Sequence, residues 1–319
     1  MDSSPGYPYM LLAPTNKEIW QFHHQLIVDV VIDRLERLAS LASDIHGFTP
    51  QQCIALGLVD PVKVFVKGEP HSLKKFSSKR WRLISSVSIV DQVIERLLCS
   101  LQNKTEISQW HLCPSAPGLG LSRDEDLAAV AKRLRCMASV APLAQTDIRG
   151  FDMSIKEWNL LLDAERRADL AGSSSDSLFR QLLMARARCL ARSVYVLPGG
   201  VCLAQTTPGV QLSGSYNTSS TNSFMRVSLA VLAGSGDAIA MGDDCVEQYS
   251  DHAEQWYKEM GYTLRFYDRC DTKIDFCSTL FDLETLRAHP VDGTKTLYRF
   301  LEQMYTRDNV AMLYQQLAS

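Results

Sequence analysis

Hydrophobic residues recur at helical spacing over much of the chain. Between residues 17 and 42 the apolar positions follow the repeat of about 3.6 residues that is typical of an amphipathic helix. The same repeat predicts further helices at residues 89–101, 123–137, 155–171, 178–192, 219–232 and 252–260. Helical segments are also expected toward the C-terminus, whereas residues 1–16, rich in Pro, Gly and Ser, are typical of a loop.

Shorter apolar runs bounded by turn-forming residues predict strands. They lie at residues 62–67, 81–84, 143–147, 238–241, 245–248, 263–267 and 276–282, with a further hairpin over residues 193–204. Residues 62–67 and 81–84 are expected to pair with each other. The runs on either side of Gly242-Asp243-Asp244 suit a tight hairpin turn. Because strands and helices mix without strict βαβ alternation, the predicted fold class is α+β.

The composition is that of a folded globular protein and excludes several other classes. With 319 residues, 46% of them hydrophobic and 22% charged, the chain is long enough for about two domains. No apolar run suits a transmembrane segment, and the N-terminus lacks the features of a secretory signal. Nine scattered cysteines without a C-x-x-C pair argue against a zinc ribbon or a disulfide framework and favour thiols in a reducing compartment.

Positive charge is concentrated in one short stretch. Residues 63–82 contain seven Lys or Arg residues and one acid, although the whole chain has a net charge of −3. A basic segment in an acidic molecule can gather phosphate groups at one place. Trp81 lies within it and suits either a core position or stacking on a nucleotide. A solvated, lysine-rich surface loop would give the same pattern, so this window alone leaves both interpretations open.

Two clusters of aspartates stand at the ends of predicted strands. Asp147 ends the strand at 143–147 and Asp152 follows five residues later, while Asp243 and Asp244 occupy the predicted hairpin turn. If the two strands are neighbours, Asp147 and Asp243 converge. Converging carboxylates repel one another unless a cation neutralises them, and hard oxygen ligands favour Mg²⁺ or Mn²⁺. A pair of such ions suits phosphoryl transfer, although Gly-Asp-Asp alone is also compatible with an ordinary turn.

The segment between the two clusters, residues 213–223, begins as a flexible Gly/Ser loop and ends in a predicted helix. Thr218 and Asn222 are four residues apart, so they share one face of that helix. Beside a metal site this polar face can bind a sugar hydroxyl. In isolation it is also typical of an N-capped helix with an ordinary polar surface.

In chain order, these segments resemble the RNA-dependent RNA polymerases of positive-strand RNA viruses, most closely the sobemovirus, polerovirus and picornavirus-like enzymes. The resemblance runs from near the N-terminus to about residue 282. Motif G corresponds to Ser4–Tyr9, and motif F corresponds to Lys67–Ser72 together with Lys79–Ile84. Motif A is Asp147-x4-Asp152, motif B is Ser213-Gly214-x3-Thr218-x3-Asn222, and motif C is Gly242-Asp243-Asp244. Motif D corresponds to residues 252–269 and motif E to Phe276-Cys277-Ser278. Each motif alone is weak, but their common order and spacing make the resemblance specific.

The resemblance implies a right-hand polymerase with fingers, a palm of antiparallel sheet plus helices, and a partial thumb. The implied divisions are fingers 1–95, first part of the palm 96–190, a fingers insertion 191–211, second part of the palm 212–282, and the start of the thumb 283–319. Complete relatives usually extend further at both ends. The chain is therefore expected to be a segment of a longer polyprotein or an unusually small enzyme.

The resemblance also implies roles for individual residues. Asp147, Asp243 and Asp244 would be catalytic and bind two Mg²⁺ or Mn²⁺ ions, with Asp244 the weaker ligand. The nucleotide-binding residues would be Lys67, Arg80 and Arg82 at the triphosphate, and Asp152, Ser213, Gly214, Thr218 and Asn222 around the ribose. The residues at the template RNA would be Ser4, Gly6 and Tyr7. The family's proton donor to pyrophosphate is usually a lysine of motif D; because an arginine, here Arg269, is a poor donor, Lys273 is favoured.

The implied activity is the addition of ribonucleotides to an RNA 3′-hydroxyl during viral genome replication. Reverse transcriptases usually carry a bulky aromatic residue where this chain has Asp152, so ribonucleotides are favoured. A reverse transcriptase and a catalytically silent, polymerase-like RNA-binding module are the alternatives. The implied partners are template and primer RNA, ribonucleoside triphosphates, a genome-linked protein primer and other viral replication proteins. The expected location is the host-cell cytoplasm, at membrane-associated replication complexes.

Overall fold

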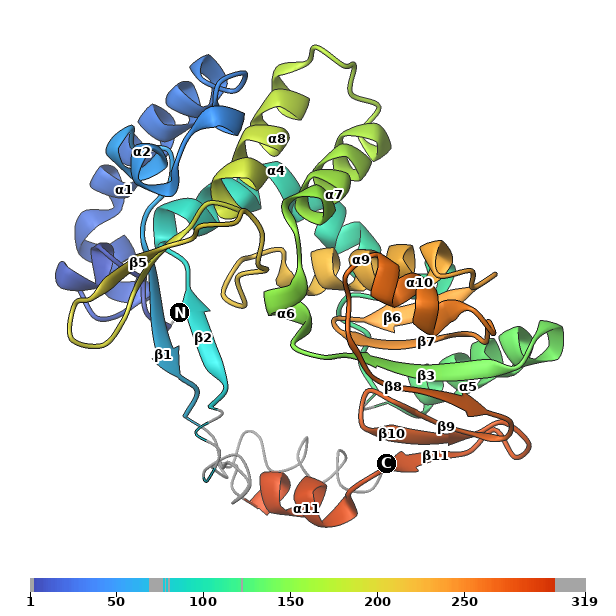
Figure 1. The fold of residues 1–319 in the computed structure, drawn as a ribbon. Coiled ribbons are helices and arrows are strands. Elements are labelled where there is room, and N and C mark those ends of the chain that lie inside the picture. Colours follow the sequence, from blue (N-terminus) through green and yellow to red (C-terminus); the bar gives the residue numbers. More distant parts are fainter. Residues whose placement is uncertain (1–2, 69–76, 78, 80, 122, 302–319) are drawn as a thin grey trace. The chain divides into compact units, whose positions relative to one another are not determined.

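The computed structural model describes residues 3–68, 77, 79, 81–121 and 123–301 (Figure 1). Arg80 and residues 69–76, which belong to the basic segment at residues 63–82, lie outside the described residues. Contacts within the chain divide it into two compact units. The first unit comprises residues 1–103 and 150–221, and the second comprises residues 104–149 and 222–319. The predicted boundaries of fingers, palm and thumb stay predictions.

Helices supply most of the core of the first unit. They are α1 (Asn16–Ser40), α2 (Pro50–Ala55), α4 (Ile89–Ser108, which continues into the second unit), α6 (Phe151–Ser154), α7 (Glu157–Leu170) and α8 (Leu178–Leu190), with short 3₁₀ helices at Tyr9–Leu11 and Ile45–Gly47. α1 begins where Thr15 and Glu18 cap each other's backbone N–H groups. Its buried residues, including Ile27 and Leu38, share one hydrophobic cluster with Ile94 of α4.

A four-stranded sheet in the order β2-β1-β4-β5 completes the first unit. Its strands are β1 (Val62–Val66), β2 (Leu83–Ser86), β4 (Val194–Val196) and β5 (Cys202–Ala204). β1 and β2 pair antiparallel, with Val66 opposite Leu83, which confirms the predicted pairing of these two strands. β4 pairs antiparallel with β5, so the predicted hairpin over residues 193–204 is also confirmed.

The second unit contains a four-stranded antiparallel sheet, β6-β7-β3-β8, and a three-stranded sheet, β11-β10-β9. The strands are β3 (Leu143–Ile148), β6 (Ala238–Met241), β7 (Asp244–Gln248), β8 (Leu264–Cys270), β9 (Lys273–Phe276), β10 (Thr279–Asp282) and β11 (Ala288–Pro290). The helices are α5 (Asp124–Val140), α9 (Thr218–Leu232, which starts in the first unit), α10 (Ala253–Glu259), α11 (Gly293–Leu301) and a 3₁₀ helix at Trp110–Leu112. Leu134 of α5 is buried in one cluster with Leu143 and Val246 of the larger sheet.

The mixture of helices and largely antiparallel sheets confirms the predicted α+β class. One predicted strand is wrong: residues 276–282 belong to two strands, β9 and β10, joined by a turn at Cys277 and Ser278. Both turn residues have positive φ angles, 55° and 60°. Two-residue turns of this kind favour Gly, Asn or Asp, so these residue types carried no turn signal. Within the described ranges, no helix combines the length and the apolar character that crossing a membrane requires.

Candidate active site

The Gly242-Asp243 turn presents acidic residues at the tip of a hairpin. β6 and β7 pair antiparallel up to Met241 opposite Asp244, which leaves a two-residue loop. Gly242 has a φ of +63°, in the left-handed region that glycine adopts without strain. Its N–H donates a 2.8 Å hydrogen bond to Ser223 Oγ on α9, so the turn is fixed to that helix. The predicted tight hairpin is therefore confirmed.

β3 lies directly beside β7 in the same sheet. Their register pairs Thr146 with Cys245, so Asp147 and Asp244 stand one position further along on neighbouring strands. Facing Cα atoms in such a pair are about 4.5–5.5 Å apart. The register of β3 with β8 shifts between Asp147 and Ile148, and irregularities of this kind can redirect a side chain next to an active site. The condition under which Asp147 and Asp243 are expected to converge, that their strands are neighbours, is therefore met, and the convergence of their carboxylates stays a prediction.

Asp147 forms an ion pair with a residue of β8, the strand on the other side of β3 from β7. Arg265 Nη1 on β8 lies 2.8 Å from Asp147 Oδ2, and the two side chains are 67% and 31% exposed. Ion pairs that are open to water contribute little free energy, because water and salt compete for both groups. The pair therefore leaves the Asp147 carboxylate available to another cation.

Negative charge accumulates around Asp244. Burial, and then the neighbouring carboxylates of Asp243, Asp275 and Asp147, raise the pKa of Asp244 from 3.8 to about 6, and Arg226 partly opposes this shift. Sequence reasoning missed Asp275 on β9, whose own pKa is raised by burial. The one signal in the sequence is that Asp275 directly precedes motif E.

A divalent cation fits this donor set chemically. Carboxylate oxygens are the ligands that Mg²⁺ and Mn²⁺ prefer, and the raised pKa of Asp244 reflects negative charge that its surroundings do not fully compensate. Among the described residues, no group of three or more His, Cys, Asp or Glu side chains is arranged so that it could hold a metal. Asp147, Asp243 and Asp244 thus supply suitable ligands at one edge of the sheet, although their side chains are not gathered around a common point.

A mainly apolar groove of about 350 Å³ in the first unit brings together residues that the sequence predicts to bind the nucleotide. Asp152 and Ser213 contribute polar groups to its lining, and Trp81, Leu83 and Tyr195 contribute aromatic and apolar surface. Binding sites for small organic ligands typically combine apolar walls with a few polar groups. The groove therefore suits a flat ligand with hydrogen-bonding groups, such as a base with its ribose.

The Gly/Ser loop at residues 213–217 lies directly against the backbone of β2. Ser85 N–H donates to Ser213 Oγ at 3.0 Å, and Gly214 N–H donates to the Ser85 carbonyl oxygen at 3.0 Å. A Cβ atom on Gly214 would stand 2.2 Å from that carbonyl oxygen. The loop can therefore approach β2 this closely only with glycine at position 214.

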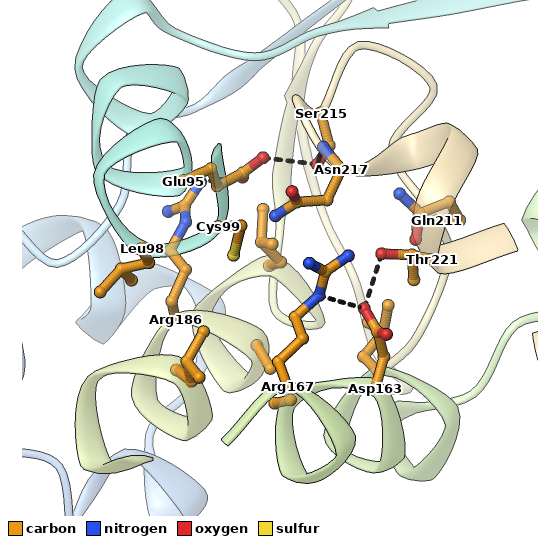
Figure 2. A pocket seen from close by; sticks show the side chains of 15 residues that line it. Glu95, Leu98, Cys99, Asp163, Arg167, Arg186, Gln211, Ser215, Asn217 and Thr221 are labelled. Atoms are coloured by element: carbon orange, nitrogen blue, oxygen red, sulfur yellow. Dashed lines mark hydrogen bonds and ion pairs between the residues drawn. The ribbon is translucent and has the colours of Figure 1, made fainter. Parts of the chain in front are cut away.

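A small cavity of about 50 Å³, lined by apolar and charged side chains, lies between this loop and the helices α4, α7 and α8 of the first unit (Figure 2). Glu95 of α4 accepts hydrogen bonds from Ser215 Oγ at 2.6 Å and from Tyr216 N–H at 2.8 Å. Arg186 of α8 lies 2.9 Å from the other Glu95 oxygen. The loop is thus fixed by a buried ion pair.

The start of α9 is fixed in a similar way from α7. Asp163 accepts a 2.8 Å hydrogen bond from Thr221 Oγ1 and forms a 2.9 Å ion pair with Arg167, as Figure 2 shows. Burial alone would raise the pKa of Asp163, but Arg167 and Arg166 hold it at about 2. Sequence reasoning missed these charged residues of α4, α7 and α8, which no recognised motif contains.

The other predicted nucleotide-binding residues occupy several elements. The Thr218 hydroxyl, at the start of α9, lies 2.9 Å from the carbonyl oxygens of both Leu212 and Ser215. Asn222 is further along the same helix and only 5% exposed. Just beyond the β1–β2 ladder, Lys67 N–H donates to the Arg82 carbonyl oxygen at 2.8 Å. The contacts of these residues with a nucleotide stay predictions.

The predicted proton donor and template residues lie elsewhere in the chain. Lys273 begins β9 and is exposed. Gly6, between Ser4 and Tyr7, has a φ of +72°, and a Cβ atom there would stand 2.7 Å from the Val87 carbonyl oxygen. The role of Lys273 and the contacts of Ser4, Gly6 and Tyr7 with RNA stay predictions.

Comparisons with known proteins cover nearly the whole chain. The model of a family described as viral RNA-directed RNA-polymerase matches residues 3–282. The chain is 41% identical over 324 residues to the replicase polyprotein P2AB of Southern cowpea mosaic virus, covering 99% of this chain and 33% of that protein. It is 42% identical over 312 residues to the RNA-directed RNA polymerase of Mushroom bacilliform virus, covering 94% of this chain and 74% of that protein. The chain thus spans about a third of the viral polyprotein and about three quarters of the second relative.

A solved structure shares the fold at lower sequence identity. The Sicinivirus 3Dpol RNA-dependent RNA polymerase matches with a TM-score of 0.66 at 16% identity, covering 93% of this chain and 63% of that chain. At this identity the match concerns the fold. It confirms the predicted right-hand polymerase architecture of the α+β class.

Proposed function

Because the chain belongs to the viral RNA-directed RNA polymerase family, we propose that it catalyses template-directed RNA synthesis. In this reaction the 3′-hydroxyl of an RNA attacks the α-phosphorus of a ribonucleoside triphosphate, a phosphodiester bond forms, and pyrophosphate leaves. One observation carries the proposal. Asp147 and Asp244 stand on neighbouring strands next to Asp243, and their mutual repulsion contributes to raising the pKa of Asp244 to about 6.

The three aspartates would hold two divalent ions, with Asp147 and Asp243 as the main ligands. When bound, such ions lower the pKa of the attacking hydroxyl and stabilise the charge on the leaving pyrophosphate. The Arg265 guanidinium competes with a cation for the Asp147 carboxylate, but the ion pair is exposed and water can replace the guanidinium at little cost. Asp244, beside both, would complete the negative field that attracts the cations.

The groove of the first unit would accept the ribonucleotide. Asp152 and Ser213 line it and offer hydrogen-bonding groups to ribose hydroxyls, and the Trp81 ring offers a plane on which a base can stack. Lys67 and Arg82 are joined by a backbone hydrogen bond at the end of the β1–β2 pair. Their positive charges would stabilise the triphosphate as negative charge builds up during the reaction.

The alternatives differ in which residues they require. A reverse transcriptase needs to exclude the ribose 2′-hydroxyl, whereas an aspartate at position 152 can accept a hydrogen bond from it. A catalytically silent RNA-binding module has no need for three mutually repelling carboxylates at one sheet edge. RNA synthesis from ribonucleotides is therefore the function that the site supports best.

The test is extension of a primed RNA template with Mg²⁺ and either ribo- or deoxyribonucleoside triphosphates. We expect the wild type to incorporate ribonucleotides and Asp243→Ala to lose this activity. Asp251→Asn is the matched control, since it removes an exposed carboxylate beyond the opposite end of β7 from Asp244. Preference for deoxyribonucleotides would identify a reverse transcriptase instead, and RNA binding without extension would identify a silent module.

A further inference from the structure

Arg226 is a fully buried arginine, 0% exposed, on α9 in the second unit. Its guanidinium contacts groups from three other parts of that unit. Nε donates to the Asp243 carbonyl oxygen at 3.2 Å, and Nη1 donates to Tyr257 Oη on α10 at 3.1 Å. Nη2 donates to Thr146 Oγ1 on β3. One planar group thus connects α9, α10, β3 and the acidic turn.

Two of these contacts involve the segments that carry the proposed metal ligands. The carbonyl oxygen belongs to Asp243 itself, and Thr146 directly precedes Asp147 along β3. The donors of a guanidinium stand in a fixed, planar fork, so the groups that bind it are held at a set distance and direction from one another. A lysine ammonium carries the same charge on a flexible stem without this fork.

Arg226 is linked through Tyr257 of α10 to a buried acid on β7. Tyr257 Oη donates to Glu247 Oε2 at 2.8 Å, and Glu247 is itself fully buried on β7. Burying an ion is costly unless polar neighbours satisfy it, and apolar side chains of similar volume often stabilise a fold as well or better. Stability alone therefore does not explain a buried arginine with this network. Its contacts are better explained by the geometry that they impose.

We propose that Arg226 is a positioning residue that holds the segments carrying Asp147 and Asp243 in a fixed relative position, from which their carboxylates can bind a shared pair of divalent ions. It acts through the Asp243 carbonyl oxygen and Thr146, without touching an ion, a nucleotide or RNA. The inference rests on the proposed polymerase function, because it assigns the two aspartates to metal binding. It goes beyond that function by naming what sets their geometry.

The test compares the wild-type chain with Arg226→Lys and Tyr257→Phe. Mn²⁺ binding is measured without RNA or nucleotide, from the electron paramagnetic resonance signal of the free ion, and kcat and KM for the nucleotide are measured in primer extension. Arg226→Lys should weaken Mn²⁺ affinity and lower kcat by about 10- to 100-fold, the usual loss when a residue that orients metal ligands is changed. KM for the nucleotide should stay nearly unchanged. Tyr257→Phe keeps the guanidinium and should show a smaller loss in the same direction.

Leu134→Ala on α5 is the matched control, because it opens a cavity in the core of the same unit and leaves the Arg226 network intact. It should lower the melting temperature and leave Mn²⁺ affinity unchanged. The inference is overturned if Arg226→Lys binds Mn²⁺ and turns over like the wild type, or if Leu134→Ala weakens Mn²⁺ binding equally.

If Arg226→Lys does not fold, Thr146→Val provides the decisive variant, because it removes one hydroxyl contact of the guanidinium and keeps the side-chain volume. Wild-type Mn²⁺ affinity in Thr146→Val would then overturn the inference, and weakened affinity would support it. The failure of the proposed function is distinguishable, because it would appear as a wild type that binds Mn²⁺ and synthesises no RNA. The failure of the inference would appear as unchanged Mn²⁺ affinity in the variants.

Discussion

Replacing Asp244 by asparagine should stabilise the protein when no divalent ion is present. Burial and the neighbouring carboxylates, that of Asp243 first, raise the pKa of Asp244 from 3.8 to about 6. An acid whose pKa is raised on folding binds more protons in the folded state than in the unfolded state. Its ionised form therefore destabilises the fold, and this penalty grows as the pH rises from about 4 to about 6.

The magnitude follows from the size of the shift and the exposure of the side chain. Raising the pKa of Asp244 from 3.8 to about 6 corresponds to about 3 kcal/mol of differential free energy between its two protonation states. Neighbouring groups desolvate the Asp244 carboxylate only in part, because the residue is exposed at the hairpin tip; water therefore screens its repulsion by the other carboxylates, and the effective penalty is smaller. We therefore expect Asp244→Asn to raise the free energy of unfolding by about 1 kcal/mol at neutral pH.

Urea unfolding in the presence of a chelator measures this gain at about pH 7.5 and about pH 4.5. The advantage of Asp244→Asn should shrink at the lower pH, where the wild-type carboxyl is largely protonated in the folded state. Asp251→Asn is the control, and its free energy of unfolding should stay within about 0.5 kcal/mol of the wild type. An absent gain at the higher pH, or a gain that does not depend on pH, would refute the electrostatic interpretation.

Three further variants test other parts of the site. Gly214→Ala should destabilise the chain by about 2–4 kcal/mol in urea unfolding. Its Cβ atom would stand 2.2 Å from the Ser85 carbonyl oxygen, so the hydrogen bond between Gly214 and Ser85 would break. Gly47→Ala is the control and should be nearly neutral, because there is open space around Gly47. Arg265→Ala should strengthen Mn²⁺ binding and change the free energy of unfolding by less than about 1 kcal/mol, whereas weaker Mn²⁺ binding would mean that the arginine supports the site. Asp152→Ala should lower the preference for ribo- over deoxyribonucleotides in primer extension; an unchanged preference would remove Asp152 from the ribose site.

The sequence predicted the acidic hairpin well because its determinants are local. Short apolar runs specify β6 and β7, and Gly242 supplies the left-handed backbone that a two-residue turn needs. The position of β3 beside them was inferred from function, since carboxylates that bind one pair of ions have to converge. The β9–β10 turn failed as a prediction because Cys277 and Ser278 adopt positive φ angles that their residue types seldom favour.

The buried charges of the site were beyond sequence reasoning for a different physical reason. Glu95, Arg186 and Arg226 each stand on a helix, where a charged residue is ordinarily a solvent-facing one. Their partners lie far away in the sequence: Glu95 binds Arg186, which is 91 positions away, and Ser215, which is 120 positions away. No local pattern spans such separations, so these pairs emerge only when the fold brings the helices together.

These buried ions explain how an ordinary apolar core can support chemistry that needs defined geometry. Apolar contacts favour burial but are nearly indifferent to direction, whereas hydrogen bonds from a guanidinium or to a carboxylate fix both distance and angle. Both units contain this arrangement: Glu95 fixes the Gly/Ser loop, and Arg226 fixes the acidic turn. Because loops and turns have little core of their own, a directional tie to a rigid helix is the means by which their position becomes reproducible. Conservative changes at Glu95 and Arg226 should therefore affect kinetic constants more than the free energy of unfolding, and core truncations such as Leu134→Ala should do the reverse.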